Sequence, residues 1–272
     1  MHGRPMVTLL LVLAISIAGC APPRGDTPAD GDADTRQEVA VVTSGDLAAA
    51  YDLLAPRFQD ETGIRLVTAY GASTGGAPDS IPARLERGER FDVLVMSQAG
   101  LNALAERGLV RPDTRVDVAS SSIGMAVREG APLPDISTPD AFVETLLAAE
   151  SIGYSASVSG TYVSEELFPR LGVAEQLAPK SRRIVSERVA TVVARGELEI
   201  GFQQVSEILS IEGAAYVGPI PDEYQRVTTF STGITTDAEN PDGAQRLMDF
   251  LASSEAAATI AETGLEPLTG SN

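Results

Sequence analysis

Short apolar runs alternate with amphipathic stretches from residue 39 onward, and this alternation is the strongest constraint on the fold. The runs at 39–42, 64–70 and 91–96 have the length and β-branched content of buried strands. Between the first two, apolar residues recur at the spacing of a helix that ends at Gly63. Parallel strands need such crossover helices, so the pattern predicts an α/β fold with mainly parallel sheets flanked by helices.

The pattern changes after Asp117, which indicates a second lobe. We expect 122–127 to form a strand that leaves the first sheet, and a long β-branched strand at 227–235 to return to it. Asn240-Pro241 then opens a helix. Shorter strands of the second lobe are expected at 152–154, 183–185 and 200–202. These elements predict a two-lobe chain, with 38–121 and 229–272 in lobe 1 and 122–228 in lobe 2.

An apolar run ends in Ile17-Ala18-Gly19-Cys20, before a segment rich in Pro, Gly and Asp. It is shorter than the roughly 20 apolar residues of a transmembrane helix and has the length of a secretory signal. Its ending resembles the lipobox of bacterial lipoproteins; the alternative is an ordinary secretory signal. We therefore expect 1–19 to be a signal peptide, Cys20 to carry a lipid anchor and 20–37 to be a flexible tether. The protein is then exported, in the periplasm or on the outer face of the cell membrane.

Removal of residues 1–19 also removes His2, the only histidine, and Cys20 is the only cysteine. This excludes a Ser-His-Asp triad, a Cys-His pair, disulfides and zinc sites built on His or Cys. The chain contains no D-x-[DN]-x-[DN]-G calcium loop, so we expect no metal and no cofactor. The net charge of −18 argues against a nucleic-acid partner.

Hydroxyl, amide and glycine residues follow four predicted strands, each time just before a helix. These loops are Thr43–Asp46, Gly71–Gly76, Ser155–Thr161 and Phe202–Gln204. Ligands collect beyond the carboxyl ends of parallel strands, and helix N-termini favour anions. One such loop is more often a plain helix cap. Four in one chain predict an anion-binding cleft between the two lobes.

Five segments also carry a resemblance to a known family. They are V-x-S-G-D-L at 42–47, YGASTGG at 70–76, IGYSASVSGTYVSEELFPRLGV at 152–173, VARGELEIGFQQ at 193–204 and NPDGAQRLMDFLASSEAAATIAETGLEPL at 240–268. In this order and spacing, the chain over 39–268 resembles the molybdate-binding family of periplasmic solute-binding proteins. The resemblance implies a monomeric clamshell of two α/β lobes, joined by crossing segments near 123–127 and 230–234. Such a protein delivers a small anion to an ABC-type permease.

The resemblance also implies the residues that hold the anion. They are Ser44 in the first loop, Ser73 or Thr74 in the second, the segment 156–159 with Ser157 and Ser159 in the third, and the backbone amide of Val189. Two departures stand out. Gln203 and Gln204 replace the tyrosine of the molybdate binders, and Arg188 borders the cleft.

Arg188 bears on the chemical class of the ligand. An Arg fork suits a carboxylate, so Arg188 makes an organic acid a candidate ligand beside a molybdate-like oxyanion. The alternative is a surface arginine that pairs with Glu187 or Glu165.

Two classes of function remain open. The leading expectation is a solute receptor for an ABC-type importer, with no catalytic residue and no chemistry of its own; a third possibility is a sensor subunit that presents its closed form to a membrane partner. The alternative is an exported isomerase of an unsaturated tricarboxylate, similar to aconitate isomerases on the same scaffold. Such an enzyme needs an acid or base, for which Glu165, Glu166, Tyr162 or an activated serine are candidates.

Overall fold

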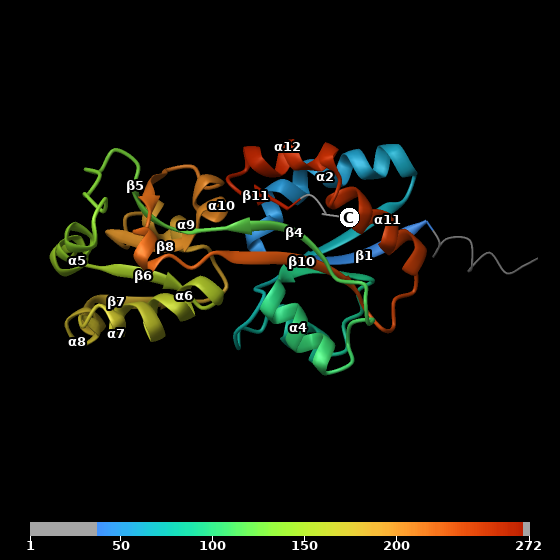
Figure 1. Ribbon diagram of the computed structural model, residues 1–272, viewed down its shortest axis with the longest axis horizontal. Helices are drawn as coiled ribbons and strands as arrows, with labels where there is room; N and C mark the ends of the chain where they lie inside the picture. The colour runs from blue at the N-terminus through green and yellow to red at the C-terminus, as the bar shows by residue number, and fades with distance from the viewer. Residues whose placement is uncertain (1–36, 269–272) are drawn as a thin grey trace, which may run out of the picture.

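Two sheets flanked by helices lie side by side along the long axis of the molecule (Figure 1). The computed structural model describes residues 37–268. The predicted signal peptide (1–19), Cys20 and the predicted tether up to residue 36 lie outside these residues. Within the described part, no helix is long and apolar enough to span a membrane.

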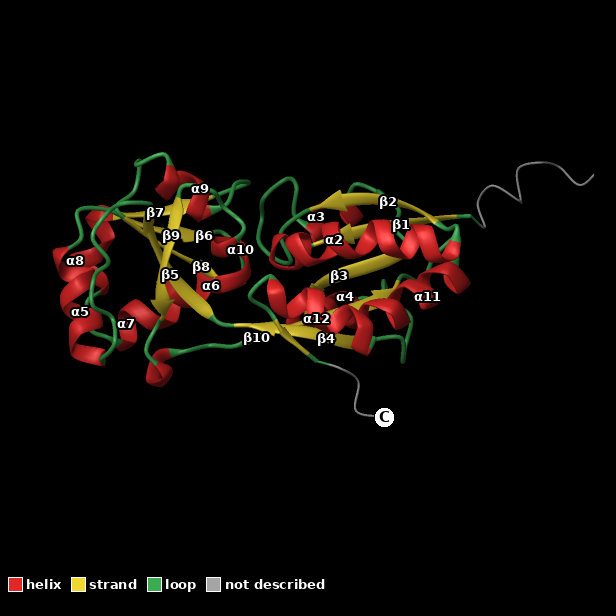
Figure 2. Ribbon diagram, turned by 90° about the horizontal axis from the view of Figure 1, so that it is seen from above, coloured by secondary structure: helices red, strands yellow, loops and turns green. Residues whose placement is uncertain are grey.

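The first sheet has the strand order β11-β4-β10-β3-β1-β2. Its strands are β1 Glu38–Thr43, β2 Arg65–Tyr70, β3 Val93–Ser97, β4 Val116–Ser121, β10 Thr228–Ile234 and β11 Glu266–Pro267. β1 is parallel to β2 and β3, whereas β10 is antiparallel to both β3 and β4. The parallel strands β1 and β3 therefore end on the same edge, which faces the second sheet (Figure 2).

The second sheet has the strand order β7-β6-β8-β5-β9. Its strands are β5 Ile123–Arg128, β6 Ile152–Ser155, β7 Ser181–Ile184, β8 Ile200–Gln204 and β9 Ala214–Pro219. β6 is parallel to β7 and β8, and β5 is antiparallel to β8 and β9. The ends of β6, β7 and β8 thus lie together.

Helices cover both faces of the first sheet. They are α2 Gly45–Thr62, α3 Ile81–Glu86, α4 Gln98–Glu106, α11 Pro241–Leu251 and α12 Ser254–Glu262. The apolar stripe of α2, including Tyr51 and Phe58, is buried with residues of α11 and α12 in one core cluster. Residues of α3 and α4 line a separate cluster with Leu94 and Met96. Gly63, at φ 71°, ends α2 in the left-handed conformation that glycine adopts without strain.

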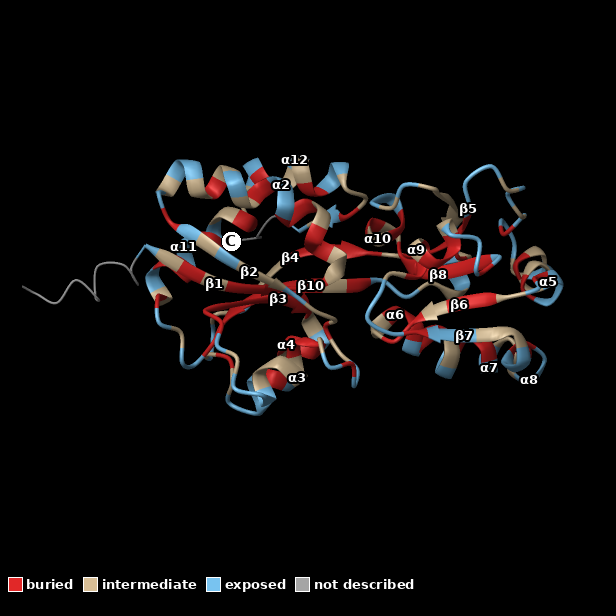
Figure 3. Cartoon of the chain, turned by 180° about the vertical axis from the view of Figure 1, so that it is seen from behind, coloured by how far each residue is buried: buried red, intermediate tan, exposed pale blue. Residues whose placement is uncertain are grey.

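The second sheet has shorter helices. They are α5 Pro139–Ala148, α6 Val158–Tyr162, α7 Phe168–Arg170, α8 Ala174–Leu177, α9 Val189–Ala194 and α10 Val205–Leu209, with a π-helical turn Val163–Leu167 and 3-10 turns Ala178–Lys180 and Asp222–Tyr224. Phe202 on β8 packs edge-on against Phe142 and Phe168, with ring centroids 6.0 and 6.5 Å apart. The sheets are the buried centre of each half, whereas helix faces and loops are exposed (Figure 3).

The chain crosses between the sheets twice. It passes from β4 to β5 at Ser122, and it returns between Pro219 and Thr228. Gln225 ties the crossings together, because its Oε1 accepts from the Ile123 N–H at 2.8 Å and its Nε2 donates to the Ile123 carbonyl at 3.0 Å. The predicted crossings at 123–127 and 230–234 instead lie inside β5 and β10, because both segments pair with neighbouring strands.

The predicted α/β class with two lobes is confirmed, although both sheets are mixed rather than mainly parallel. The crossing strands cause this difference: β10 and β5 enter their sheets antiparallel to the strands beside them. β4, β9 and the short β11 were not predicted. β4 reads VDVASS, which contains three polar residues, and β9 reads AAYVGP, in which a short run of mostly small apolar residues ends in Gly-Pro and is only half-buried.

Candidate functional site

A cavity of about 270 Å³ lies between the two sheets. Residues of both halves line it: Gly45, Asp46, Ala48, Asp52, Tyr70, Gly71, Ala72, Ala77 and Asp79 from the first, and Ser155, Ala156, Ser157, Ile184, Ser186, Glu187, Arg188, Gln203 and Glu207 from the second. Helices α2 and α9 begin at the cavity, as do α6 and α10. Because these helix starts carry partial positive charge, the cavity favours anionic groups at its edge.

Three of the predicted site residues line the cavity: Ser157, Arg188 and Gln203. Ser157 precedes α6, and its hydroxyl makes no capping bond to that helix. Gln203 is buried at the end of β8, where its Oε1 accepts from the Ala190 N–H at 3.1 Å. Its amide therefore links β8 to the start of α9.

Ser44 is fully buried directly before the lining residues Gly45 and Asp46. It occupies the N-cap position of α2, yet its side chain makes no capping hydrogen bond. Within residues 37–268, its Oγ makes no hydrogen bond of good geometry, although it lies close enough to the Asp46 carboxyl to lower the pKa of that group. A buried hydroxyl without a partner costs about 1–3 kcal/mol. Its position at the cavity edge is thus not explained by helix capping.

The other four predicted residues do not line the cavity. Ser73 is fully buried, and its Oγ accepts from the Ser97 N–H at 2.9 Å. The Ser159 hydroxyl is paired with that of Ser155 at 3.2 Å. The side chain of Val189 packs in an apolar cluster, and Thr74 is half-buried in the 71–76 loop.

Arg188 bridges the two halves of the cavity. Its Nη1 donates to Ser210 Oγ at 3.0 Å, and its Nη2 donates to the carbonyl of Gly45 at 3.5 Å. The expected surface pairing with Glu187 does not form, because Glu187 binds Arg195 instead, at 2.9 Å. The Arg188 guanidinium therefore remains beside the cavity.

Asp46 and Glu207 bring two carboxyl groups into contact from opposite halves. Burial raises the pKa of Asp46 to about 6, against the lowering effects of Ser44, Glu207 and Arg188 nearby. Burial first and the Asp46 charge second also raise the pKa of Glu207 well above its usual range. Burial therefore favours the protonated form of both groups, and the Asp46 charge adds to this effect at Glu207.

Further contacts cross the cavity. Ser186 Oγ donates to Asp79 Oδ1 at 2.9 Å, and Ser206 Oγ donates to the Asp46 carbonyl at 2.9 Å. Gly75 lies against the other half so closely that a Cβ there would be 2.6 Å from the carbonyl oxygen of Ala156. The two halves are therefore in the contacting, closed arrangement.

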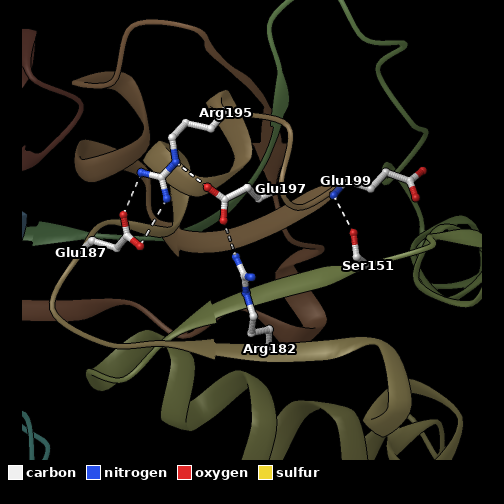
Figure 4. Close-up of polar contacts among 6 residues, drawn as sticks. All are labelled: Ser151, Arg182, Glu187, Arg195, Glu197 and Glu199. Carbon is white, nitrogen blue, oxygen red and sulfur yellow. Dashed lines mark hydrogen bonds and ion pairs between the residues drawn. The ribbon is translucent and has the colours of Figure 1, made fainter.

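A chain of exposed ion pairs supports the loop before α9 (Figure 4). Arg195 binds Glu187 with both terminal nitrogens, and its Nε donates to Glu197 at 2.6 Å. Glu197 in turn binds Arg182 at 3.3 Å. These contacts turn the Glu187 carboxylate towards Arg195.

Sequence reasoning missed Asp46, Glu207, Asp79 and Ser186. Asp46 is the last residue of a predicted loop and Glu207 lies shortly after another, yet an acid in the first turn of a helix is ordinary, so position alone does not mark them. The acid–base candidates Glu165, Glu166 and Tyr162 do not line the cavity. Glu166 binds Arg226 at the surface, and the Tyr162 hydroxyl donates to the Tyr224 carbonyl at 2.6 Å. Across the described residues, no cluster of acidic side chains is arranged to hold a metal.

The two-lobe fold and the cavity define a clamshell of the kind found in solute-binding proteins of ABC importers. Residues 39–266 match the family described as bacterial extracellular solute-binding protein, and the chain belongs to that family. This membership implies an exported or periplasmic protein, as expected.

Two solved structures share the fold. The periplasmic molybdate-binding protein of Azotobacter vinelandii superposes with a TM-score of 0.69 at 19% identity, covering 84% of this chain and 98% of that one. The sulfate-binding protein SubI of Mycobacterium tuberculosis superposes with a TM-score of 0.68 at 19% identity, covering 85% and 87%. The predicted resemblance to molybdate-binding proteins is thereby confirmed at the level of the family.

A curated relative corrects one expectation. A protein of a Pseudomonas species named aconitate isomerase is 43% identical over 230 residues, 85% of this chain and 88% of its own length. The expectation that a chain of this kind performs no chemistry is therefore wrong. The scaffold is shared with receptors, but sequence similarity at this level points to an enzyme.

Proposed function

We propose that this protein is an exported isomerase that interconverts the geometrical isomers of an unsaturated tricarboxylate such as aconitate. The relative named aconitate isomerase supports this reaction, because the similarity spans most of both chains. The cavity supports it independently, because it combines anion-binding features with groups that can carry a proton.

The observation that carries the proposal is the acidic lining of the cavity. Five carboxyl side chains line it: Asp46, Asp52, Asp79, Glu187 and Glu207. A receptor for a small anion gains nothing from carboxylates, since like charges weaken anion binding. An isomerase needs them, because moving a carbon–carbon double bond requires an acid and a base, and the described chain offers no histidine for this role.

We infer that Arg188 and the neutral donors at the cavity hold the substrate. An Arg fork binds a carboxylate with two parallel hydrogen bonds, and Arg188 already lies between the two halves. Ser44, Ser157 and Gln203 supply hydroxyl and amide groups around it. Ser73, Thr74, Ser159 and the Val189 amide would then support the loops rather than touch the ligand. This donor set favours an organic acid over a molybdate-like oxyanion.

The proposed export of the protein also bears on Cys20, which lies outside the cavity. We infer that Cys20 carries the lipid that tethers the protein to the membrane, and that the chain acts as a monomer. Metabolic labelling with a fatty acid tests the first point, since Cys20→Ala would remain unlabelled. Docking to an ABC-type permease stays a prediction that is separate from the chemistry.

Incubation with pure cis- or trans-aconitate, followed by proton NMR, tests the proposed reaction. Each isomer should give the same final mixture in the presence of catalytic amounts of protein. Thermal shift with molybdate, sulfate and tricarboxylates is the control for binding; a ligand at about a hundred times its Kd adds roughly 2.7 kcal/mol of stability. A shift with molybdate alone, together with unchanged aconitate, would refute the proposal.

A further inference from the structure

We propose that Asp46 and Glu207 form the proton-transfer pair of this isomerase, with Asp46 as the base and Glu207 as the acid. The inference rests on the proposed function and names the groups that perform it. Asp46 lies in the first turn of α2, and Glu207 lies in the first turn of α10, so the pair is built from both halves of the molecule. Helices α2 and α10 lie against each other (Figure 2).

The packing holds the two carboxyl groups together. A Cβ at Gly45 would lie 2.7 Å from Glu207 Oε1, so the Glu207 carboxyl rests directly on the start of α2. Ser206, beside Glu207, donates through Oγ to the Asp46 carbonyl at 2.9 Å. Because every one of these contacts spans the two halves, the pair exists only when the cavity is closed.

The pair differs from the other carboxyl groups of the cavity. Asp52 accepts from the Tyr70 hydroxyl, Asp79 accepts from Ser186 at 2.9 Å, and the Glu187 carboxylate binds Arg195. Each of these three has a partner that holds its carboxyl in place. Asp46 and Glu207 instead face each other, with Ser44 beside Asp46, Gln203 beside Glu207 and the Arg188 charge near both.

Contact between the two groups assigns their roles. Burial raises the pKa of both groups, and the Asp46 charge raises that of Glu207 further, whereas contact with Glu207 lowers that of Asp46, so the shared proton resides on Glu207. With a pKa of about 6, Asp46 is ionised at neutral pH. A base and an acid are thus present together before substrate arrives. The charged groups around them are Arg188 and the cavity carboxylates of Asp52, Asp79 and Glu187.

The reaction balances with these two groups alone. Asp46 takes a proton from the methylene carbon, and the electron pair of that C–H bond forms a double bond to the central carbon. The electron pair of the original double bond moves to the former vinylic carbon, which receives the proton of Glu207. The product is again a propene tricarboxylate, and its geometry depends on how the cavity holds the methylene carboxylate. The proton then passes from Asp46 to Glu207, which restores the pair.

Asp46→Asn and Glu207→Gln test the assignment, with Glu165→Gln as the matched control at an exposed carboxyl outside the cavity. General acid–base groups contribute about 10²–10⁴-fold, so each cavity variant should lose kcat by about that factor. Binding of trans-aconitate, measured by calorimetry, should persist or tighten because a negative charge is removed. The melting temperature should not fall, and Glu165→Gln should match the parent protein.

Two further measurements use the parent protein. Its kcat should fall as the pH drops below about 6, because Asp46 becomes protonated. In D₂O the first turnover should place one solvent deuterium on carbon, since the proton delivered by Glu207 exchanges with water.

The outcomes separate the two claims. If the parent protein isomerises aconitate and either variant keeps its rate, or if kcat does not fall with acidification, or if the first product contains no deuterium, the assignment of the pair is wrong. A parent protein that does not isomerise aconitate refutes the proposed function instead.

Discussion

Ser186 Oγ donates a hydrogen bond to Asp79 Oδ1 at 2.9 Å, and this bond joins the two halves at the edge of the cavity. Ser186 adopts a φ of 61°, in the left-handed region that a serine rarely occupies. The residue after it, Glu187, is bound to Arg195 (Figure 4). The loop is thus held in a strained conformation that presents the Ser186 hydroxyl to the opposite half.

Ser186→Ala should weaken closure without unfolding either half. The lost hydrogen bond involves a charged acceptor, and such bonds contribute about 1.5–3 kcal/mol. With saturating tricarboxylate, solution scattering should show a larger radius of gyration than for the parent protein. Ser186→Gly is the second variant, since it also lacks the hydroxyl but relieves the positive φ. Closure that matches the parent in both variants would show that this bond is dispensable.

Gly75→Ala should prevent close approach of the halves, and Gly76→Ala is its matched control. A Cβ at Gly75 would lie 2.6 Å from the carbonyl oxygen of Ala156, whereas a Cβ at Gly76 meets nothing within 4 Å. Gly75 also has a φ of 95°, so alanine there adds strain within the loop. Ligand affinity should fall in Gly75→Ala alone. Equal affinities in the two variants would contradict the closed arrangement.

Ser44→Ala should weaken ligand binding and leave the ligand-free melting temperature nearly unchanged. The Ser44 hydroxyl is fully buried and makes no capping bond, so its removal leaves the N-terminal capping of α2 unchanged. A hydrogen bond to a charged ligand contributes about 1.5–3 kcal/mol, which corresponds to roughly 10- to 150-fold in Kd.

Ser97→Ala is the control for Ser44→Ala. Ser97 is equally buried at a strand end, but its Oγ caps α4 by accepting from the Gly100 N–H at 3.3 Å. Loss of such a cap typically costs about 1 kcal/mol of stability. Ser97→Ala should therefore lower the melting temperature and keep ligand affinity. If Ser44→Ala instead lowered the melting temperature and kept ligand affinity, Ser44 would act as a helix cap.

The pKa of Asp46 predicts how the stability of the ligand-free protein depends on pH. Its pKa rises from 3.8 to about 6 on folding, so folding favours the protonated form. The stabilising contribution is present below pH 3.8 and is lost as the pH rises through about 6. The melting temperature of Asp46→Asn should therefore exceed that of the parent protein increasingly between pH 4 and 7. A constant difference over this range would contradict the raised pKa.

The strands that sequence reasoning predicted best are those with continuous apolar content. β1 and β3 are largely buried on both faces and therefore stand out, whereas β4 contains polar residues and β9 consists mostly of small residues that are only half-buried. The loops after β1, β6 and β8 were identified from their hydroxyl and amide residues, and Ser157, Arg188 and Gln203 do line the cavity. These residues share a local signature: each lies just before the start of a helix that follows a strand.

The acidic pair has no local signature. Asp46 and Glu207 are far apart in the chain, and each alone is an ordinary acid in the first turn of a helix. Only the packing of α10 on α2 brings them into contact. For the same reason, the sequence pattern of a receptor and that of an enzyme on this scaffold are nearly alike, and the expectation of a protein without chemistry was wrong.

One NMR time course decides whether the protein isomerises aconitate and whether Asp46 takes part. The purified parent protein is mixed with pure cis-aconitate at neutral pH, and the vinyl and methylene resonances are followed beside a sample that contains Asp46→Asn. We expect trans-aconitate to appear with the parent protein until both isomers reach equilibrium, and to appear about 10²–10⁴-fold more slowly with the variant. If cis-aconitate binds to the parent protein and stays unchanged, the protein is not an aconitate isomerase.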